Sequence, residues 1–244
     1  MPNELLWFAF MTLDLTMVLV LFRFFGKTGL YAIIVFNLIL CNIQVLKTVE
    51  LFGFVTTLGN ILYASIFLAT DLLGEFYGKK SARKGVLLGF ITLLLAVAYM
   101  QIAIRFAPAP GDFAQPLFEG IFGLLPRLAA ASLAAYLLSQ MHDVWAYEFW
   151  KKKTEGRHLW LRNNASTVVS QAIDTVVFCS IAFIGVFPAG VWFEITCTTY
   201  LFKLVVALAD TPFIYLAKRL FPAVAATDAA ESPRPAAAPE AEQA

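Results

Sequence analysis

Residues 85–106 read GVLLGFITLLLAVAYMQIAIRF, a run in which Arg105 is the only charged side chain. A helix needs about 20 mostly apolar residues to cross a bilayer, so this run predicts a transmembrane helix. The same window, moved along the rest of the chain, finds six more candidate spans: Leu5 to Phe25, Thr28 to Leu46, Gly53 to Leu73, Leu117 to Gln140, Thr167 to Phe187 and Val191 to Leu216. The sequence therefore predicts an all-α integral membrane protein with about seven transmembrane helices.

The composition agrees with this fold class. Hydrophobic residues make up 60% of the 244 residues and charged residues only 14%, whereas soluble domains are about 25% charged. This excludes a soluble globular protein. The formal net charge of +1 gives no overall basic field, so we expect no direct contact with nucleic acid. Residues 5–25 lack the basic start and the cleavage site of a signal peptide, and we expect them to stay in the chain.

Basic residues predict the orientation, because Lys and Arg concentrate in cytoplasmic loops. They follow every odd-numbered span, which places the N-terminus outside and the C-terminus in the cytoplasm. From Pro222 the chain becomes rich in Ala, Pro and Glu. We therefore expect one transmembrane domain, residues 1–222, and a disordered cytoplasmic tail, residues 223–244. The basic residues that carry this argument are Arg23, Lys27, Lys79, Lys80, Arg83, Lys84, Lys151, Lys152, Lys153, Arg157, Arg162, Lys218 and Arg219.

The sixth and seventh spans carry the strongest candidates for a binding site. Thr167, Gln171 and Asp174 share one helical face, and Asp174 lies near mid-membrane. Lys203 lies near the middle of the next span, where an ammonium group needs an anionic partner, and we expect that partner to be Asp174. Both residues are candidate substrate contacts. The alternative, a charge pair that only holds two helices together, stays open.

Further polar residues extend this candidate site. Asn60 and Asp71 lie three turns apart on one face of the third span and are expected to line a cavity. Glu194 is expected at the outer mouth, as a substrate contact. Arg127 directly follows Pro126, which permits a broken helix of the kind that forms transporter sites.

Ser132 and Asp14 are the last two polar residues of interest within the spans. Ser132 begins a polar stripe in the fifth span and is a candidate substrate contact; Arg127 is read equally well as a structural counter-ion. Asp14, in the first span, is expected to contribute to packing between helices, and a functional role for it stays open.

The sequence contains no HExxH, GxSxG, Walker or GxGxxG motif. We therefore expect no enzymatic activity, no cofactor and no metal.

Four stretches resemble one family of transporters. They are TDLLGEFYGKKSARKG (70–85), RLAAASLAAYLLSQMHDV (127–144), LWLRNNASTVVSQAIDTVVF (159–178) and YLFKLVVALADTPFIY (200–215). These stretches are similar to the queuosine precursor transporters of the vitamin uptake transporter family, over about residues 30–220. The extra segment 5–25 departs from the six-helix members. The residues that match the family's motifs are Asp71, Arg127, Ser132, Ser166, Thr167, Asp174, Glu194 and Lys203.

The resemblance implies import of a deazapurine base through the cytoplasmic membrane. Members of this family carry 7-cyano-7-deazaguanine or its 7-aminomethyl relative across the membrane for the queuosine modification of tRNA. We therefore expect a secondary or facilitative carrier. A carboxylate can accept both the N1–H and the 2-amino group of such a base. Phe67, Trp192 and Tyr200 are candidate stacking faces. The preferred precursor, the driving force and the oligomeric state stay open, with a homodimer as one option.

Two alternatives come from other classes of protein. Seven spans with a lysine in the seventh are what a retinal pigment needs, and added retinal would then produce visible absorbance. Polar faces on several helices argue against an apolar retinal pocket. The second alternative is the substrate-binding membrane subunit of a vitamin-type importer, which would copurify with ATPase subunits.

Overall fold

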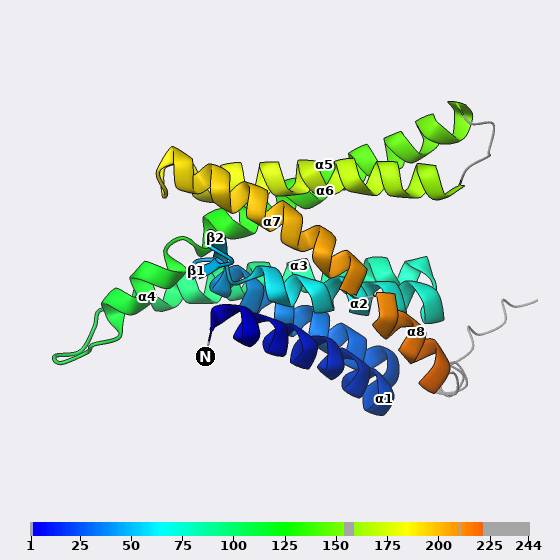
Figure 1. The fold of residues 1–244 in the computed structure, drawn as a ribbon. Helices are drawn as coiled ribbons and strands as arrows, with labels where there is room; N and C mark the ends of the chain where they lie inside the picture. The colour runs from blue at the N-terminus through cyan, green and yellow to red at the C-terminus, as the bar shows by residue number, and fades with distance from the viewer. Residues whose placement is uncertain (1, 154–158, 210, 222–244) are drawn as a thin grey trace, which may run out of the picture.

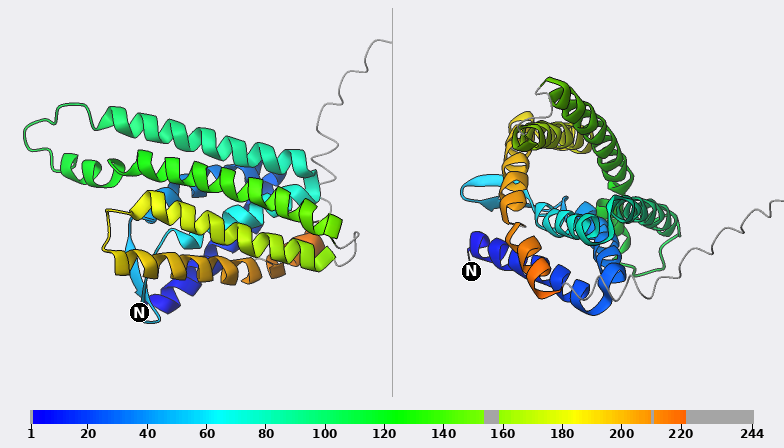
Figure 2. Two further views of the ribbon diagram at one scale, coloured as in Figure 1. Left: turned by 90° about the horizontal axis from the view of Figure 1, so that it is seen from above. Right: turned by 90° about the vertical axis from the view of Figure 1, so that its right-hand side faces the viewer.

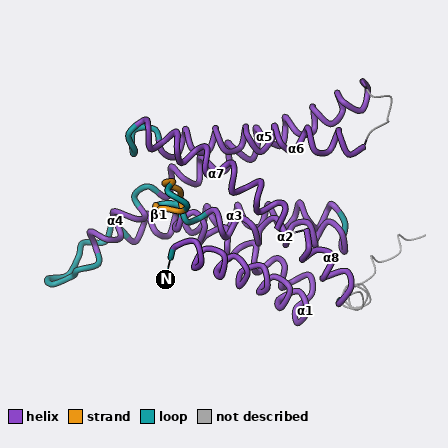
Figure 3. Tube along the Cα trace, in the orientation of Figure 1, coloured by secondary structure: helices purple, strands orange, loops and turns teal. Residues whose placement is uncertain are grey.

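The computed structural model describes residues 2–153, 159–209 and 211–221. Nearly all of this part of the chain is helical, with one short pair of strands (Figure 3). The expectation of a mainly α-helical membrane protein is confirmed. The expected tail, residues 223–244, lies outside the described residues. The elements are α1 (Asn3–Gln44), β1 (Thr48–Leu51), β2 (Phe54–Thr57), α2 (Asn60–Tyr77), α3 (Lys79–Ala103), α4 (Gln115–Phe122), α5 (Leu125–Lys153), α6 (Leu159–Phe183), α7 (Ala189–Ala209) and α8 (Thr211–Leu220).

Helix α1 contains the first two expected spans, folded into a hairpin. Gly26 has φ 51° and ψ −132°, which no residue inside a helix adopts and which favours glycine. The chain turns back at this point, because Asn37 Nδ2 lies 2.8 Å from Asp14 Oδ1 although the two residues are 23 positions apart. Asp14 thus makes the expected contact between the two halves of α1.

We expect Gly29→Ala to open this hairpin and lower the thermal stability of the protein. A Cβ atom at Gly29 would lie 2.3 Å from the backbone oxygen of Leu21, and backbone cannot move aside as a flexible side chain can. Such overpacking costs about 1 to 3 kcal/mol. The measurement is thermal unfolding in detergent. Gly120→Ala in α4 is the control, because a Cβ there meets nothing within 4 Å; equal melting temperatures for the two variants would contradict the prediction.

The third span was expected to start at Gly53, which is earlier than the helix that the structure shows. Residues 48–57 form a β-hairpin in which Leu51 pairs with Phe54, and α2 begins only at Asn60. The two turn residues, Phe52 and Gly53, both have positive φ, as in the type I′ turn that suits two antiparallel strands. Our window from Gly53 was wrong at this end because β2 is apolar enough to extend a hydropathy profile.

Two other expected spans differ from the observed helices. The fifth span is split into α4 and α5, which begins at Leu125, so Pro126 lies in the first turn of a new helix, where its missing N–H costs nothing. Helix α6 begins at Leu159 rather than Thr167 and ends at Phe183. The seventh expected span covers most of α7 and the first part of α8, which flank Asp210, a residue outside the described part of the chain. The expected broken helix at Pro126 is confirmed.

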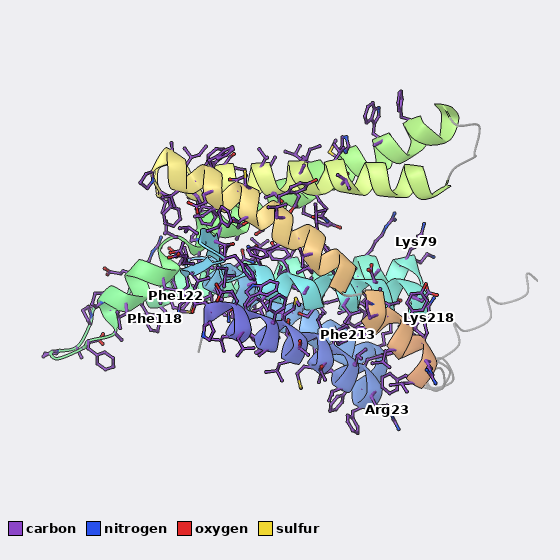
Figure 4. All side chains as sticks on the ribbon, in the orientation of Figure 1. Arg23, Lys79, Phe118, Phe122, Phe213 and Lys218 are labelled. Carbon is purple, nitrogen blue, oxygen red and sulfur yellow. The ribbon has the colours of Figure 1, made fainter. Side chains whose placement is uncertain are left out.

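The helices form two groups joined by α7. Helices α1, α2 and α3 pack together, and α5 packs along α6 (Figures 1 and 2). Helix α7 contacts α6 as well as α2 and β2, so it crosses from one group to the other. Arg23, Lys79 and Lys218 lie at one end of the bundle, and Phe118 lies toward the opposite end (Figure 4). The basic residues of three connections therefore share one end.

The lengths of the apolar helices agree with a protein that crosses a bilayer several times. Within the described residues, four helical stretches are long and apolar enough to span it: Asn3–Gln44, Lys79–Ala103, Gln115–Ser139 and Ala189–Val206. The first of them is the hairpin described above, and Val168–Phe183 is a shorter apolar stretch. Many of the large hydrophobic side chains on these helices are exposed, including Leu13, Leu94 and Phe193. In a bilayer this exposed apolar surface faces lipid.

Candidate functional site

A central cavity of about 370 Å³ lies between the two groups of helices. Helices α1, α2 and α3 line it from one group, and α5 and α6 line it from the other. This is where a small solute would be enclosed by both halves of the protein. The lining residues are Ile34, Leu38, Tyr63, Ile66, Phe67, Thr70, Asp71, Ala82, Arg83, Val86, Phe90, Ser132, Tyr136, Ser139, Ser170, Gln171 and Asp174.

The cavity combines aromatic walls with a few polar groups. Tyr63 and Phe67 lie one turn apart on α2, with ring centroids separated by 6.0 Å. Phe90 of α3 and Tyr136 of α5 form a second ring pair, with centroids 5.1 Å apart. Aromatic faces of this kind stack on flat heterocycles. The cavity is therefore suited to a planar ligand with several hydrogen-bonding groups.

Asp174 and Lys203 form an ion pair at the wall of the cavity. Lys203 Nζ lies 2.5 Å from Asp174 Oδ2, and the expected pairing is confirmed. The Lys203 side chain is only 5% exposed and that of Asp174 is 21% exposed. The ammonium group also lies 5.3 Å from the centroid of the Tyr63 ring, a cation–π contact. Asp174 faces the cavity while Lys203 lies behind it, so a ligand meets the carboxylate first.

Two more expected residues lie beside Asp174. Gln171, one turn away on α6, lines the cavity, and its Oε1 is buried without a hydrogen bond to any described residue. The Ser132 hydroxyl donates to Asn42 Oδ1 over 3.0 Å and so links α5 to α1. Gln171 and Asp174 together present acceptor oxygens to a ligand.

Asp71 lines the same cavity two turns along α2 from Tyr63. It makes no hydrogen bond or ion pair with any described residue, and Arg83 of α3 lines the cavity as well. Further polar groups lie on α5 and α6: His142 Nδ1 is 3.0 Å from the Ser170 hydroxyl, and Ser139 donates to the carbonyl of Tyr136. The cavity thus contains four of the expected site residues: Asp71, Ser132, Gln171 and Asp174.

The other expected site residues lie outside the lining of the cavity. Asn60 is buried and donates to the hydroxyls of Thr56 and Thr199, both over 3.3 Å. Arg127 donates to the backbone carbonyls of Ile181 and Ile184 and so caps the end of α6. Thr167 lies in α6, but its side chain is outside the described part of the chain.

Glu194 accepts a backbone hydrogen bond from the edge of the β-hairpin. Its Oε1 accepts a 2.7 Å hydrogen bond from the Val55 N–H, and Thr198 donates to the Val55 carbonyl over 3.1 Å. Both backbone groups of Val55 are therefore satisfied by side chains of α7. This geometry holds β2 against α7. It places Glu194 at the hairpin and away from the central cavity.

We expect Glu194→Ala to lower the melting temperature and to leave the half-saturation of transport unchanged. It would leave the Val55 N–H unpaired, at a cost of about 1 to 3 kcal/mol. Glu194→Gln is the matched control, because its amide oxygen can still accept this hydrogen bond. The measurements are thermal unfolding and concentration-dependent uptake. A raised half-saturation for Glu194→Gln with unchanged stability would instead make Glu194 a substrate contact.

Of the three aromatic residues expected to stack on a substrate, one lines the cavity. Phe67 does so, whereas Trp192 donates to the Cys179 carbonyl and Tyr200 donates to the Val168 carbonyl. Sequence analysis did not single out Tyr63 or Phe90. Tyr63 was recognisable in principle, because it lies eight residues before Asp71, on the same side of α2.

Comparison with known proteins identifies the family. The profile described as "Putative vitamin uptake transporter" matches residues 57–217, which include the central cavity and the ion pair. The chain belongs to the vitamin uptake transporter family. This transporter is 46% identical over 223 residues to the "Probable queuosine precursor transporter" of Bacillus subtilis, covering 91% of this chain and 97% of that protein.

More distant relatives have the same type of name. The "Queuosine precursor transporter" of Escherichia coli is 32% identical over 170 residues, covering 68% of this chain and 74% of that protein. The "Probable queuosine precursor transporter" of Haemophilus influenzae is 30% identical over 166 residues, 64% of this chain and 66% of that protein. No solved structure matches this transporter. Its relatives are transporters rather than enzymes, and it is a multi-pass protein of the cytoplasmic membrane.

Proposed function

We propose that this transporter imports the queuosine precursor bases 7-cyano-7-deazaguanine and 7-aminomethyl-7-deazaguanine for the modification of tRNA. The names of three relatives support the substrate class. The observation that carries the proposal within this chain is the central cavity, which joins aromatic walls to the acceptor oxygens of Gln171 and Asp174. Contact with tRNA itself is not part of this function.

The chemistry of the base fits this lining. A deazaguanine has two donors on one edge, N1–H and the 2-amino group, and a carboxylate can accept both. Asp174 supplies that carboxylate and Gln171 a neighbouring carbonyl oxygen. The rings of Tyr63 and Phe67 offer stacking faces for the bicyclic base. Lys203 positions the Asp174 carboxylate through the ion pair and does not line the cavity.

The contact residues in this proposal are Asp71, Ser132, Gln171 and Asp174. Asn60, Arg127 and Glu194, which the sequence also suggested, act here through the packing of α2, α6 and the hairpin. Residues 1–222 form the transporter domain. It crosses the membrane seven times, with the N-terminus outside and the C-terminus in the cytoplasm. The support for this orientation is the gathering of Arg23, Lys79 and Lys218 at one end of the bundle.

The two alternatives each predict a separate result. A retinal protein would need its lysine free to form a Schiff base, whereas Lys203 is paired with Asp174. Purified protein with added retinal is expected to remain colourless. A subunit of a vitamin-type importer would copurify with ATPase subunits, and we expect none.

Transfer of the gene to a host provides the test. The host should be unable to make or import precursor and should be supplied with nanomolar base. We expect queuosine in its tRNA with the wild-type chain and at least tenfold less with Asp174→Asn, at equal amounts of protein in the membrane. Asp112→Asn is the matched control: it makes the same exchange at an exposed position outside the cavity, keeps the acceptor oxygen for the Ala114 N–H, and should behave like wild type. No gain of queuosine with the wild-type chain would refute the proposal.

A further inference from the structure

A second buried carboxylate lies outside the central cavity. Asp14, in the first half of α1, is 6% exposed and lies near the middle of its span. Its Oδ1 accepts from Asn37 Nδ2, but its Oδ2 is buried and has no hydrogen bond to any described residue. Asp14 also lines a groove between the two halves of α1, with a volume of about 400 Å³. A carboxylate with one unsatisfied oxygen is costly inside a membrane, and such residues commonly serve function.

We propose that Asp14 binds the proton that is transported together with the base, an inference that rests on the proposed function. One proton from the outer side forms an O–H bond on the Asp14 carboxylate, and the same bond breaks when the proton leaves to the cytoplasm. The base enters and leaves without chemical change, so atoms and charge balance in each cycle. The proton gradient then supplies the free energy for accumulation.

The composition of the groove selects a proton over a metal ion. Apart from Asp14 and Asn37, the described residues that line it are Phe10, Leu13, Met17, Leu21, Ala32, Ile33 and Phe36. None of these side chains carries an oxygen ligand. Hard cations prefer about six oxygen ligands, which the groove does not provide. A proton needs only one oxygen.

The surroundings of Asp14 contain no second charge. The second half of α1 presents the Asn37 amide to it, and α2 presents the Ser65 hydroxyl, which hydrogen-bonds to the same Asn37 nitrogen. No other titratable or charged residue of the described chain lines the groove. Any change of charge on this side of α1 therefore comes from protonation or deprotonation of Asp14.

The contact with Ser65 connects Asp14 to the substrate. Ser65 lies two residues after Tyr63, which places the two side chains on opposite faces of α2. One face meets Asn37 and Asp14, while the other lines the central cavity with Tyr63 and Phe67. Protonation of Asp14 removes the charge that strengthens its hydrogen bond with Asn37. The Asn37 amide, which also contacts Ser65, is then held less firmly, and α2 can move at the cavity.

The test uses purified protein in liposomes with labelled 7-cyano-7-deazaguanine, which is neutral, at equal concentrations on both sides. Acidification of the outside should drive wild-type protein to accumulate the base at least threefold, and a protonophore should abolish this. Asp14→Asn should exchange base across the membrane but stay at a ratio of one. Thr12→Val, on the same half of α1, should accumulate base like wild type.

Each result decides between the possibilities. Accumulation by Asp14→Asn equal to wild type would remove Asp14 as the proton site. Wild-type exchange that ignores the pH gradient would refute proton coupling, while an absence of any exchange would refute the proposed function instead. If Asp14→Asn does not fold, a pH dye inside wild-type vesicles still decides. Base added outside should acidify the interior of vesicles that contain wild-type protein, and also of vesicles that contain Asp14→Glu. An interior that wild-type protein does not acidify would overturn the inference.

Discussion

Asp174→Asn and Lys203→Met are each expected to abolish transport and reduce the yield of folded protein, whereas the double variant recovers yield but not transport. Lys203 Nζ and Asp174 Oδ2 are 2.5 Å apart, and removing one partner leaves the other charge unpaired. Breaking a buried pair in this way costs about 3 to 5 kcal/mol. The double variant has no unpaired charge, but it lacks the carboxylate that accepts the donor edge of the base.

The two single variants should not be equally unstable. Asp174→Asn strands Lys203, whose side chain is 5% exposed, whereas Lys203→Met strands Asp174, which is 21% exposed and faces the cavity. The asparagine variant should therefore have the lower melting temperature. Thermal unfolding of all four proteins forms a double-mutant cycle, and the measured coupling is the test.

A second ion pair provides the control for this cycle. Lys218 Nζ and Glu75 Oε1 are 2.7 Å apart, but both side chains are about half exposed. Exposed pairs contribute about 0 to 1 kcal/mol, so the cycle of Glu75→Gln and Lys218→Met should show little coupling. Strictly additive effects at Asp174 and Lys203, as at this control pair, would mean that the two residues do not stabilise each other.

Ala82→Trp is expected to reduce transport at least tenfold and to leave the protein folded. Ala82, on α3, lines the central cavity opposite α5 and α6, and it is half-buried. An indole there would fill much of the space that the base needs. Because Ala82 is only half-buried and borders the cavity, the indole can extend into the cavity, so the added volume should cost little stability.

The control for this substitution lies on the same helix. Ala98 is exposed on α3 and does not line the cavity, so Ala98→Trp adds the same side chain at a position that faces lipid. It should transport like wild type. Uptake of labelled base and the melting temperature are measured for both variants. Full transport by Ala82→Trp would show that the base takes another route.

The ion pair was predictable from the sequence because an unpaired charge inside a membrane is costly. Lys203 near the middle of an apolar span needs an anion, and Asp174 at similar depth was the candidate. The same reasoning was less informative at the ends of spans. The partners of Arg127 and Glu194 are backbone groups of Ile181 and Val55, and a backbone group has no signature in the sequence.

The main features of the fold were predictable, and their boundaries were less so. Apolar runs identify most helices, but the second strand, Phe54–Thr57, is apolar enough to pass for the start of a helix and was included in the span from Gly53. The two-residue turn with Gly53, flanked by β-branched residues, was the signal that would have identified the hairpin.

Transport of deazaguanine bases is tested most directly by exchange of labelled 7-cyano-7-deazaguanine by the purified protein in liposomes. We expect saturable exchange by wild type, which unlabelled 7-aminomethyl-7-deazaguanine inhibits by competition and adenine does not. We expect at least a tenfold loss with Asp174→Asn, while Ala98→Trp exchanges like wild type. Saturable exchange that is unaffected by Asp174→Asn, or the absence of exchange by folded wild-type protein, would contradict the proposed function.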